Sequence, residues 1–247
     1  MNALDVTGLD WWYDRGKPVL HGLDLRVPDG GIASISGPNG SGKSTLLRLI
    51  VGVVAPRGGT IERPVNVGYL PQSSDEPPVR LRARTWLGLV ARMKHSDATD
   101  VADHAHELGV DEALKGPLDS LSVGTLAKVL LLAAFTSSPG LIVLDEPFAP
   151  LDARSRDALT AMIERAAERG AGVVVTSHDE MPSLAGEHYV LSGGALRSRA
   201  PEARRWRVLI ASSDGTVEHI VDAAGRDTML RAALDAGHEI LAVEERT

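Results

Sequence analysis

The sequence predicts an α/β fold whose core is a parallel β-sheet. Residues 141–144 and 172–176 are short, continuous apolar runs, which is typical of strands buried on both faces of such a sheet. The segment between them places Leu159, Met162 and Ile163 on one face of a helix. A strand, a helix and a second strand in this order indicate a right-handed crossover between parallel strands.

The composition is that of an ordinary globular protein. Of the 247 residues, 43% are hydrophobic, 24% charged and only 4% aromatic, so the core must be built mostly from valine, leucine, isoleucine and alanine. The absence of cysteine excludes disulfides, thiolate zinc sites and cysteine nucleophiles. The formal net charge of −7 argues against a basic face for nucleic acid, so we expect no direct nucleic-acid partner.

No segment has the character of a signal peptide or a membrane span. The N-terminus, MNALDVTGLDWW, lacks a positive region followed by an apolar run. A spanning helix needs about 20 mostly apolar residues, and the best candidate, residues 129–135, is much too short. We expect a protein that acts on a membrane only through a partner chain.

The N-terminal part is expected to form an antiparallel β subdomain. Residues 1–36 have the character of strands, and Leu23, Leu25 and Val27 alternate with polar residues in the pattern of a half-buried strand. Residues 32–36 form a short apolar strand that runs directly into a glycine-rich segment.

The middle of the chain is expected to complete one domain over residues 1–200. A helical insertion is expected at about 77–138, because apolar residues recur there at helical spacing. The expected elements are a buried helix over 46–54, short strands over 60–62 and 66–70, and helices over 86–93, 99–108 and 126–136.

Residues 201–247 are expected to form a small α+β appendage. A turn at Asp214 and Gly215 between two strand-like segments predicts a β-hairpin. The expected elements are strands over 206–212 and 216–221, a helix over 228–236 and a strand over 239–244.

The glycine-rich segment after residues 32–36 predicts a phosphate-binding loop. Its sequence, GPNGSGKST, fits the pattern G-x-x-x-x-G-K-[ST] in the strand-loop-helix context that the pattern requires. Backbone N–H groups and the helix N-terminus can surround a triphosphate, and glycine lets the backbone approach it closely. The candidate nucleotide-binding residues are Gly37, Pro38, Asn39, Gly40, Ser41, Gly42, Lys43, Ser44 and Thr45.

Two side chains of this loop are expected to have their own tasks. Lys43 supplies a positive charge for the β- and γ-phosphates, and Ser44 supplies a hydroxyl oxygen for Mg²⁺. The alternative is a glycine-rich turn with a chance lysine, which the strand-loop-helix context disfavours.

Two acids follow the buried strand 141–144. Ligands of open parallel sheets bind outside the carboxyl ends of the strands, so Asp145 is expected near the loop, holding Mg²⁺. Glu146 is placed to polarise an attacking water. Two solvated acids at a strand end are the alternative, but the loop gives the pair two separate tasks.

Two further side chains are expected at the same edge of the sheet. His178 follows the strand 172–176 and could donate a hydrogen bond to the γ-phosphate. Gln72 follows the strand 66–70 and could contact Mg²⁺ or the water. Either residue alone would be unremarkable.

In their order, these residues resemble the ABC ATPase family over nearly all of residues 4–195. The resemblance implies a P-loop NTPase with a RecA-like sheet. The loop corresponds to Walker A, the acids to Walker B, and Gln72 and His178 to the glutamine loop and the switch histidine. Tyr13 stands where the family places an aromatic ring that stacks on adenine; Trp12 is an alternative, and a core position is possible for either.

The segment LSVGT at residues 121–125 is similar to the family signature LSGGQ. Ser122 and Gly124 match, whereas Val123 and Thr125 replace glycine and glutamine. In the family, the matching residues complete the ATP site of the opposite subunit. Asp152 resembles the D-loop aspartate and is expected to contact that subunit.

The resemblance implies a head-to-tail dimer, with itself or a related ATPase subunit, that sandwiches two ATP molecules with Mg²⁺. It implies a transmembrane permease on a separate chain, contacted through the segment after Gln72, and a cytoplasmic, peripheral position at the inner face of the membrane. The altered signature and the appendage lead us to expect export of an unknown substrate. The alternatives are an ATP-binding subunit with weak hydrolysis, a soluble non-transport ABC ATPase, and another P-loop enzyme such as a nucleotide kinase.

Overall fold

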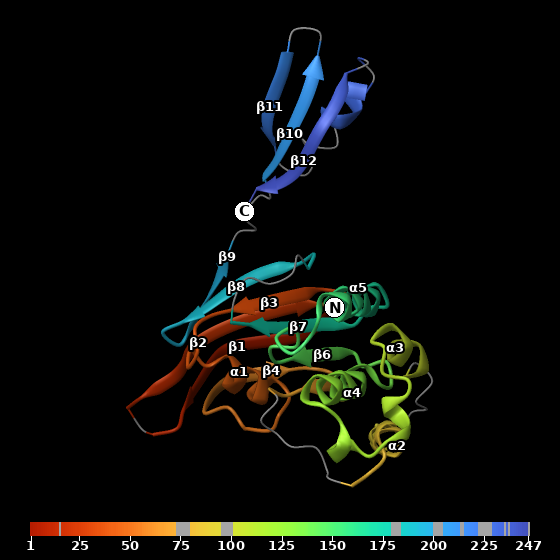
Figure 1. The fold of residues 1–247 in the computed structure, drawn as a ribbon. Coiled ribbons are helices and arrows are strands. Elements are labelled where there is room, and N and C mark those ends of the chain that lie inside the picture. Colours follow the sequence, from red (N-terminus) through yellow and green to blue (C-terminus); the bar gives the residue numbers. More distant parts are fainter. Residues whose placement is uncertain are drawn as a thin grey trace. The chain divides into compact units, whose positions relative to one another are not determined.

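A six-stranded sheet lies within the first of the two units, Met1–Arg199 and Ala200–Thr247, into which the chain divides (Figure 1). The computed structural model describes residues 1–14, 16–72, 80–94, 101–178, 184–199, 205–212, 215–221, 229–234, 236 and 238–246.

The sheet has the strand order β5-β6-β7-β3-β8-β9, and every neighbouring pair is parallel except β8 with β9. The helix α5 (Ala153–Glu168) connects β6 to β7, as the strand-helix-strand pattern predicts. The predicted parallel α/β core is therefore confirmed. The strands are β3 (Ile32–Ser36), β5 (Val67–Leu70), β6 (Leu141–Leu144), β7 (Gly172–Ser177), β8 (Glu187–Ser192) and β9 (Ala195–Arg199).

Alternate residues of the central strands face two different cores. In β6, Leu141 and Val143 pack with the N-terminal strands and α1 (Lys43–Ile50), whereas Ile142 and Leu144 pack with the helices on the other side. Because both faces are covered, the strand is apolar throughout, which explains the continuous apolar run in the sequence.

An antiparallel sheet of order β2-β1-β4 covers one of these faces, as predicted. Leu23, Leu25 and Val27 are buried in its core, which confirms the predicted alternation. The strands are β1 (Asn2–Trp12), β2 (Pro18–Pro28) and β4 (Gly58–Glu62).

The helix α1 is shorter than the one expected over residues 46–54. It begins at Lys43, directly after the glycine-rich loop, and ends at Ile50. Gly52 has a φ of 81°, a left-handed conformation that ends a helix, and its N–H bonds to the Leu49 carbonyl at 3.0 Å.

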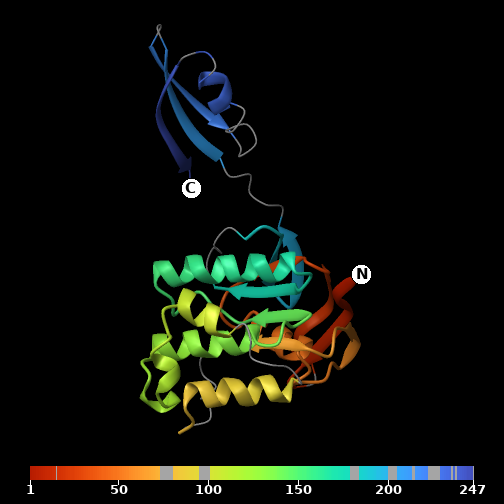
Figure 2. The same ribbon diagram turned by 90° about the vertical axis from the view of Figure 1, so that its right-hand side faces the viewer.

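The helical insertion lies on the opposite side of the first unit from the N-terminal strands, which are red in Figure 2. The last helix begins at Val123, three residues earlier than expected, because the Ser122 side chain caps it by accepting a hydrogen bond from the Thr125 N–H. The helices are α2 (Ala83–Met93), α3 (Val101–Glu107) and α4 (Val123–Phe135), with 3₁₀ turns η1 (Ala113–Lys115) and η2 (Leu118–Ser120).

The sequence analysis missed the strands β8 and β9. β9 is the edge strand and is mostly exposed, with the sequence ALRSR, whereas β8 lies between β9 and β3 and is mostly half-buried. An edge strand that faces solvent lacks the apolar pattern that reveals a buried strand.

The second unit is a three-stranded antiparallel sheet with a helix over residues 229–234. Val208, Ile210 and Ala233 form its small core. The predicted hairpin is confirmed by the pairing of β10 with β11, and Asp214 of its turn lies outside the described residues. The strands are β10 (Arg205–Ser212), β11 (Gly215–Val221) and β12 (Glu239–Arg246). Across both units, no described helix combines the length and the apolar character needed to cross a membrane.

Candidate functional site

The carboxyl ends of three adjacent strands bring the predicted residues to one edge of the sheet. β3 pairs with β7 up to Ser36 and Ser177, and β7 pairs with β6 up to Val175 and Leu144. The glycine-rich loop follows β3, the two acids follow β6, and His178 follows β7. The topology therefore gathers segments that are more than 100 residues apart in the sequence.

The loop between β3 and α1 depends on glycine at two points. A Cβ at Gly37 would lie only 2.4 Å from the Leu191 carbonyl oxygen of β8. Gly42 caps α1 in a left-handed conformation, with φ 104°, and a Cβ there would meet Leu20 at 3.0 Å. The loop closes on itself through a 3.1 Å bond from the Ser41 N–H to the Pro38 carbonyl. Such a loop can present its amides to an anion.

Lys43 joins this loop to the acids of β6. Its side chain is 5% exposed, and Nζ donates to the Gly37 carbonyl at 2.7 Å and lies 3.4 Å from Glu146 Oε1. The ammonium group therefore sits where the loop and the carboxylate meet. Ser44 is half-buried and Thr45 is buried in the first turn of α1.

The hydroxyl of Thr176, a residue that the sequence analysis did not select, forms hydrogen bonds with both acids. Thr176 Oγ1, from β7, donates to Asp145 Oδ1 at 2.7 Å and accepts from the Glu146 N–H at 3.0 Å. The signal was available, since Thr176 is a polar residue at the end of the buried run 172–176, which is otherwise apolar.

The two acids differ in burial and in which carboxylate oxygens remain available to a ligand. Asp145 is 3% exposed, and its Oδ2 atom is buried with no hydrogen-bond partner among the described residues. An orphaned buried carboxylate oxygen is costly unless a cation or water satisfies it, so this atom fits a ligand of Mg²⁺. The Glu146 carboxylate is 17% exposed, which leaves it accessible to a water molecule.

Gln72 and His178 flank these acids from the neighbouring strands. The Asp145 N–H bonds to the Leu70 carbonyl at 2.9 Å. Gln72 is only two residues beyond Leu70 in the chain. Gln72 and His178 are both exposed. The segment expected to contact a permease, residues 73–79 after Gln72, lies outside the described residues.

The aromatic residues near the N-terminus differ in their exposure to solvent. Tyr13 is 65% exposed, and its hydroxyl lies 3.3 Å from Thr45 Oγ1 in the first turn of α1. Trp11 is buried and meets the Tyr13 ring edge-on, with centroids 4.2 Å apart. Trp12 is half-buried. Tyr13 thus presents an accessible ring beside the helix that follows the loop.

The signature residues and Asp152 occupy a second cluster, at the N-termini of α4 and α5. Ser122 caps α4, and its hydroxyl lies 2.8 Å from the Thr125 hydroxyl. Asp152 caps α5 by accepting from the Ser155 N–H at 2.9 Å. Within the described part of the chain, no hydrogen bond or ion pair joins Ser122 or Asp152 to the phosphate loop.

Lys128 ties α4 to α5 within this cluster. Its Nζ donates to Asp152 Oδ2 at 2.8 Å. This bond, followed by the bond from the Ser155 N–H, lowers the pKa of the Asp152 carboxyl far below its usual range. The side chain expected to contact another subunit is therefore held by its own chain, and Gly124 faces the adjoining Pro150 carbonyl.

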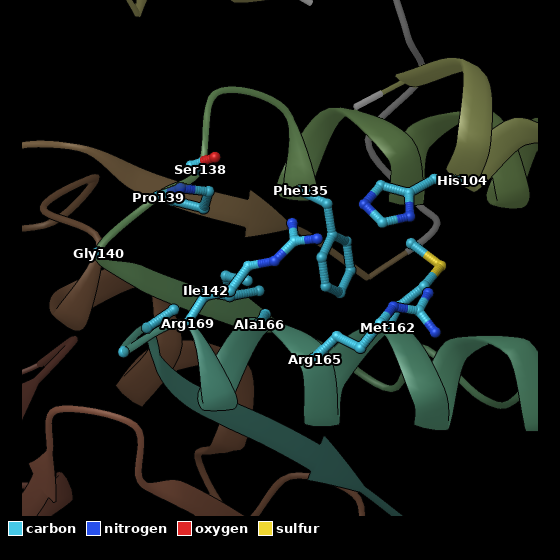
Figure 3. Close-up of a pocket in the computed structure, with 12 residues that line it drawn as sticks. His104, Phe135, Ser138, Pro139, Gly140, Ile142, Met162, Arg165, Ala166 and Arg169 are labelled. Atoms are coloured by element: carbon cyan, nitrogen blue, oxygen red, sulfur yellow. The ribbon is translucent and has the colours of Figure 1, made fainter. Parts of the chain in front are cut away.

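A cavity of about 170 Å³ lies at the other end of the parallel strands. Pro139 and Gly140 before β6, and Ala171 before β7, line it together with Phe135 and Met162 (Figure 3). None of the predicted site residues lines it. It is distinct from the edge where the loop and the acids meet.

Comparisons with known proteins agree with this geometry. Residues 20–149 match the sequence profile of the family described as ABC transporter. The zinc import ATP-binding protein ZnuC of Alkalilimnicola ehrlichii is 39% identical over 198 residues, which cover 76% of this chain and 74% of that protein. The protein of the same name from Magnetococcus marinus is 38% identical over 178 residues, covering 70% and 68% of the two chains.

A solved structure shows the same fold. The ATP-binding subunit of an ABC transporter superposes with a TM-score of 0.73 at 23% identity, covering 95% of this chain and 97% of the other. At that identity the likeness concerns the fold alone, and the family rests on the profile match and the sequence relatives. The chain therefore belongs to the ABC transporter family, as one of its ATP-binding and ATP-hydrolysing subunits.

Proposed function

We propose that the chain binds Mg-ATP at the carboxyl edge of its parallel sheet and hydrolyses it to power zinc import through a separate transmembrane subunit. The observation that carries the catalytic part is the meeting of Lys43 Nζ with Glu146 Oε1, at 3.4 Å, beside the buried Asp145. A phosphate-binding cation, a metal ligand and an accessible carboxylate come together there from distant parts of the sequence.

Each side chain has a distinct task in this proposal. Lys43 and the loop amides bind the β- and γ-phosphates. Ser44, Gln72 and Asp145 hold Mg²⁺, which when bound neutralises charge on the phosphate oxygens. Asp145 has the orphaned oxygen suited to this.

Glu146 and His178 act on the reacting groups. Glu146 orients the attacking water and takes its proton as the water oxygen bonds to the γ-phosphorus and the bond to ADP breaks. His178 donates a hydrogen bond to the γ-phosphate, and Tyr13 stacks on the adenine. The exposure of His178 at the sheet edge and of the Tyr13 ring beside the first turn of α1 supports the last two assignments.

The site is completed by a second protomer, either a copy of this chain or a related ATPase subunit. Ser122, Gly124 and Asp152 lie at the N-termini of α4 and α5, and Val123 beside them is 76% exposed. A helix N-terminus favours an anion, so α4 of one protomer can meet the γ-phosphate bound by the other.

The direction of transport and the identity of the cargo are proposed from the names of the sequence relatives. Both sequence relatives described above are named zinc import proteins. Their names favour import over the export that the sequence analysis expected, and the proposal follows them. The transmembrane subunit places the chain at the cytoplasmic face of the membrane.

The catalytic part is tested with the Glu146→Gln variant. The amide keeps the size of the side chain but cannot accept the proton of water, so we expect ATP binding to persist while steady-state hydrolysis falls by about 100-fold or more. Calorimetry measures the binding of ATP, and an assay of phosphate release measures its hydrolysis. Normal turnover by this variant would remove Glu146 from the assigned role.

The same assay addresses a second candidate, an ATP-binding subunit with weak hydrolysis. Val123 and Thr125 in the signature segment motivate it, since Thr125 engages the Ser122 hydroxyl. The two candidates differ in the wild-type rate. Hydrolysis that stays near background both with and without the transmembrane subunit supports the weak enzyme.

The assignment of zinc as the cargo is tested by measuring the uptake of radioactive zinc into cells of the organism that carries the gene. We expect uptake from zinc-poor medium to fall when the gene is deleted or carries Glu146→Gln, because the subunit supplies the energy. Manganese uptake is the matched control and should not change. Higher zinc retention in the deletion strain would instead indicate export.

A further inference from the structure

Thr176 is a polar side chain in the most deeply buried part of the sheet. It is 0% exposed and stands in β7 between Val175 and Ser177. A buried hydroxyl is destabilising unless it is hydrogen-bonded. Its bonding partners are the two acids at the end of the neighbouring strand β6, and this indicates a function beyond packing.

The geometry fixes the direction of both hydrogen bonds. An ionised carboxylate only accepts, so the hydroxyl proton of Thr176 points to Asp145 Oδ1, 2.7 Å away. The Leu144 carbonyl lies farther away, at 3.4 Å. The lone pairs of the same oxygen then accept the Glu146 N–H at 3.0 Å. One hydroxyl thus orients the side chain of the first acid and the backbone of the second.

Both acids need such a constraint. Glu146 has a φ of 50°, in the left-handed region that non-glycine residues seldom adopt, and its N–H bond to Thr176 holds the backbone there. Asp145 engages Oδ1 with Thr176, while Oδ2 remains without a partner among the described residues. The hydroxyl therefore determines which carboxylate oxygen is available for a metal ion.

We propose that Thr176 is a positioning residue for ATP hydrolysis, which sets the Mg²⁺-binding oxygen of Asp145 and the direction of the Glu146 side chain. This inference rests on the roles proposed above for the two acids. Thr176 does not belong to the phosphate loop, so its removal should affect turnover and Mg²⁺ dependence rather than the affinity for ATP.

The test compares Thr176→Val with Thr176→Ser. Valine keeps the branched shape but removes the hydroxyl, and serine keeps the hydroxyl but removes the methyl group. For Thr176→Val we expect kcat to fall by about 10- to 100-fold, the Mg²⁺ concentration for half-maximal rate to rise, and the KM for ATP to change by less than about threefold. Thr176→Ser should restore most of kcat and the Mg²⁺ dependence.

A matched control removes a similar hydroxyl elsewhere. Thr136 is 2% exposed, and its Oγ1 donates to the Leu132 carbonyl at 2.8 Å at the end of α4. Thr136→Val therefore removes a buried threonine hydroxyl away from the site, breaking one hydrogen bond to a backbone carbonyl. We expect it to lower the unfolding temperature, though less than Thr176→Val does, and to leave kcat and the Mg²⁺ dependence unchanged.

The outcomes separate this inference from the proposed function. If the wild-type protein, with its transmembrane subunit, does not hydrolyse ATP, the proposed function fails. If the wild type hydrolyses ATP and Thr176→Val matches its kcat and Mg²⁺ dependence, the inference on Thr176 alone is overturned. Should Thr176→Val not fold, Thr176→Cys replaces it and is compared with Thr176→Ser, because both lack the methyl group and the thiol forms much weaker hydrogen bonds than the hydroxyl; wild-type kinetics of Thr176→Cys overturn the inference equally.

Discussion

At the scale of single residues, exposure distinguishes Tyr13, the residue proposed to stack on adenine, from its buried neighbour Trp11. The sequence offered adjacent aromatic residues, and the structure leaves one ring accessible beside the first turn of α1. Its hydroxyl contact with Thr45 also fixes where the ring lies. An accessible aromatic ring at a nucleotide site supplies stacking area for a base.

This arrangement predicts the effect of truncating the ring. We expect Tyr13→Ala to raise the Kd for Mg-ATP by about tenfold, since stacking of a base on an aromatic residue contributes about 1–3 kcal/mol. Tyr13→Phe, which loses only the contact with Thr45, should bind nearly as the wild type does. Calorimetric titration measures all three. If Trp12→Ala weakens binding and Tyr13→Ala does not, the adenine lies on Trp12 instead.

At the scale of elements, α4 and α5 are joined at their N-termini by one ion pair. Lys128 of α4 bonds to Asp152, the capping residue of α5. The same carboxylate therefore stabilises the first turn of one helix and its contact with the next.

The lowered pKa of Asp152 gives this junction a pH dependence. A carboxyl whose pKa is lower in the folded than in the unfolded protein contributes stability above its unfolded pKa, about 4, and loses it as the pH falls toward the folded value. We expect the difference in unfolding temperature between wild type and Asp152→Asn to be largest near pH 7 and to shrink below about pH 4. Thermal unfolding monitored by circular dichroism measures it. A difference that stays constant from pH 7 to pH 3 would show that the charge of Asp152 contributes nothing.

Comparison of these elements with the sequence shows what could be predicted. The loop, the acids and His178 follow recognisable strands, and parallel strands necessarily bring their carboxyl ends to one edge. The polar character of Thr176 in a buried strand is visible in the sequence, but its hydrogen bonds to the two acids could not be predicted, because they depend on the backbone turn at Glu146 and on the register across two strands. The pairing of Lys128 with Asp152 likewise depends on how two helices pack, for which a separation of 24 residues gives no signal.

At the scale of the whole molecule, all the residues assigned to ATP belong to Met1–Arg199, and the second unit has its own core. That core is small, with only Val208, Ile210 and Ala233 as buried hydrophobic residues among those described. Each of the two units therefore has a hydrophobic core of its own.

This division predicts that the ATP site does not require the second unit. We expect a chain that ends at Arg199 to bind Mg-ATP with a Kd within about twofold of the full chain, because no assigned ligand is removed. Calorimetry on both chains tests this, with circular dichroism to confirm that the shorter chain is folded. A folded short chain that no longer binds ATP would show that residues 200–247 support the site.

The close approach of Gly37 to the Leu191 carbonyl connects the glycine-rich loop after β3 with the strand β8. The Leu191 carbonyl of β8 lies so close to the loop that only the hydrogen atom of a glycine fits between them at position 37. The position of β8 therefore limits the conformations open to the loop: a displacement of this strand by a fraction of an ångström should shift the amides proposed to bind the phosphates.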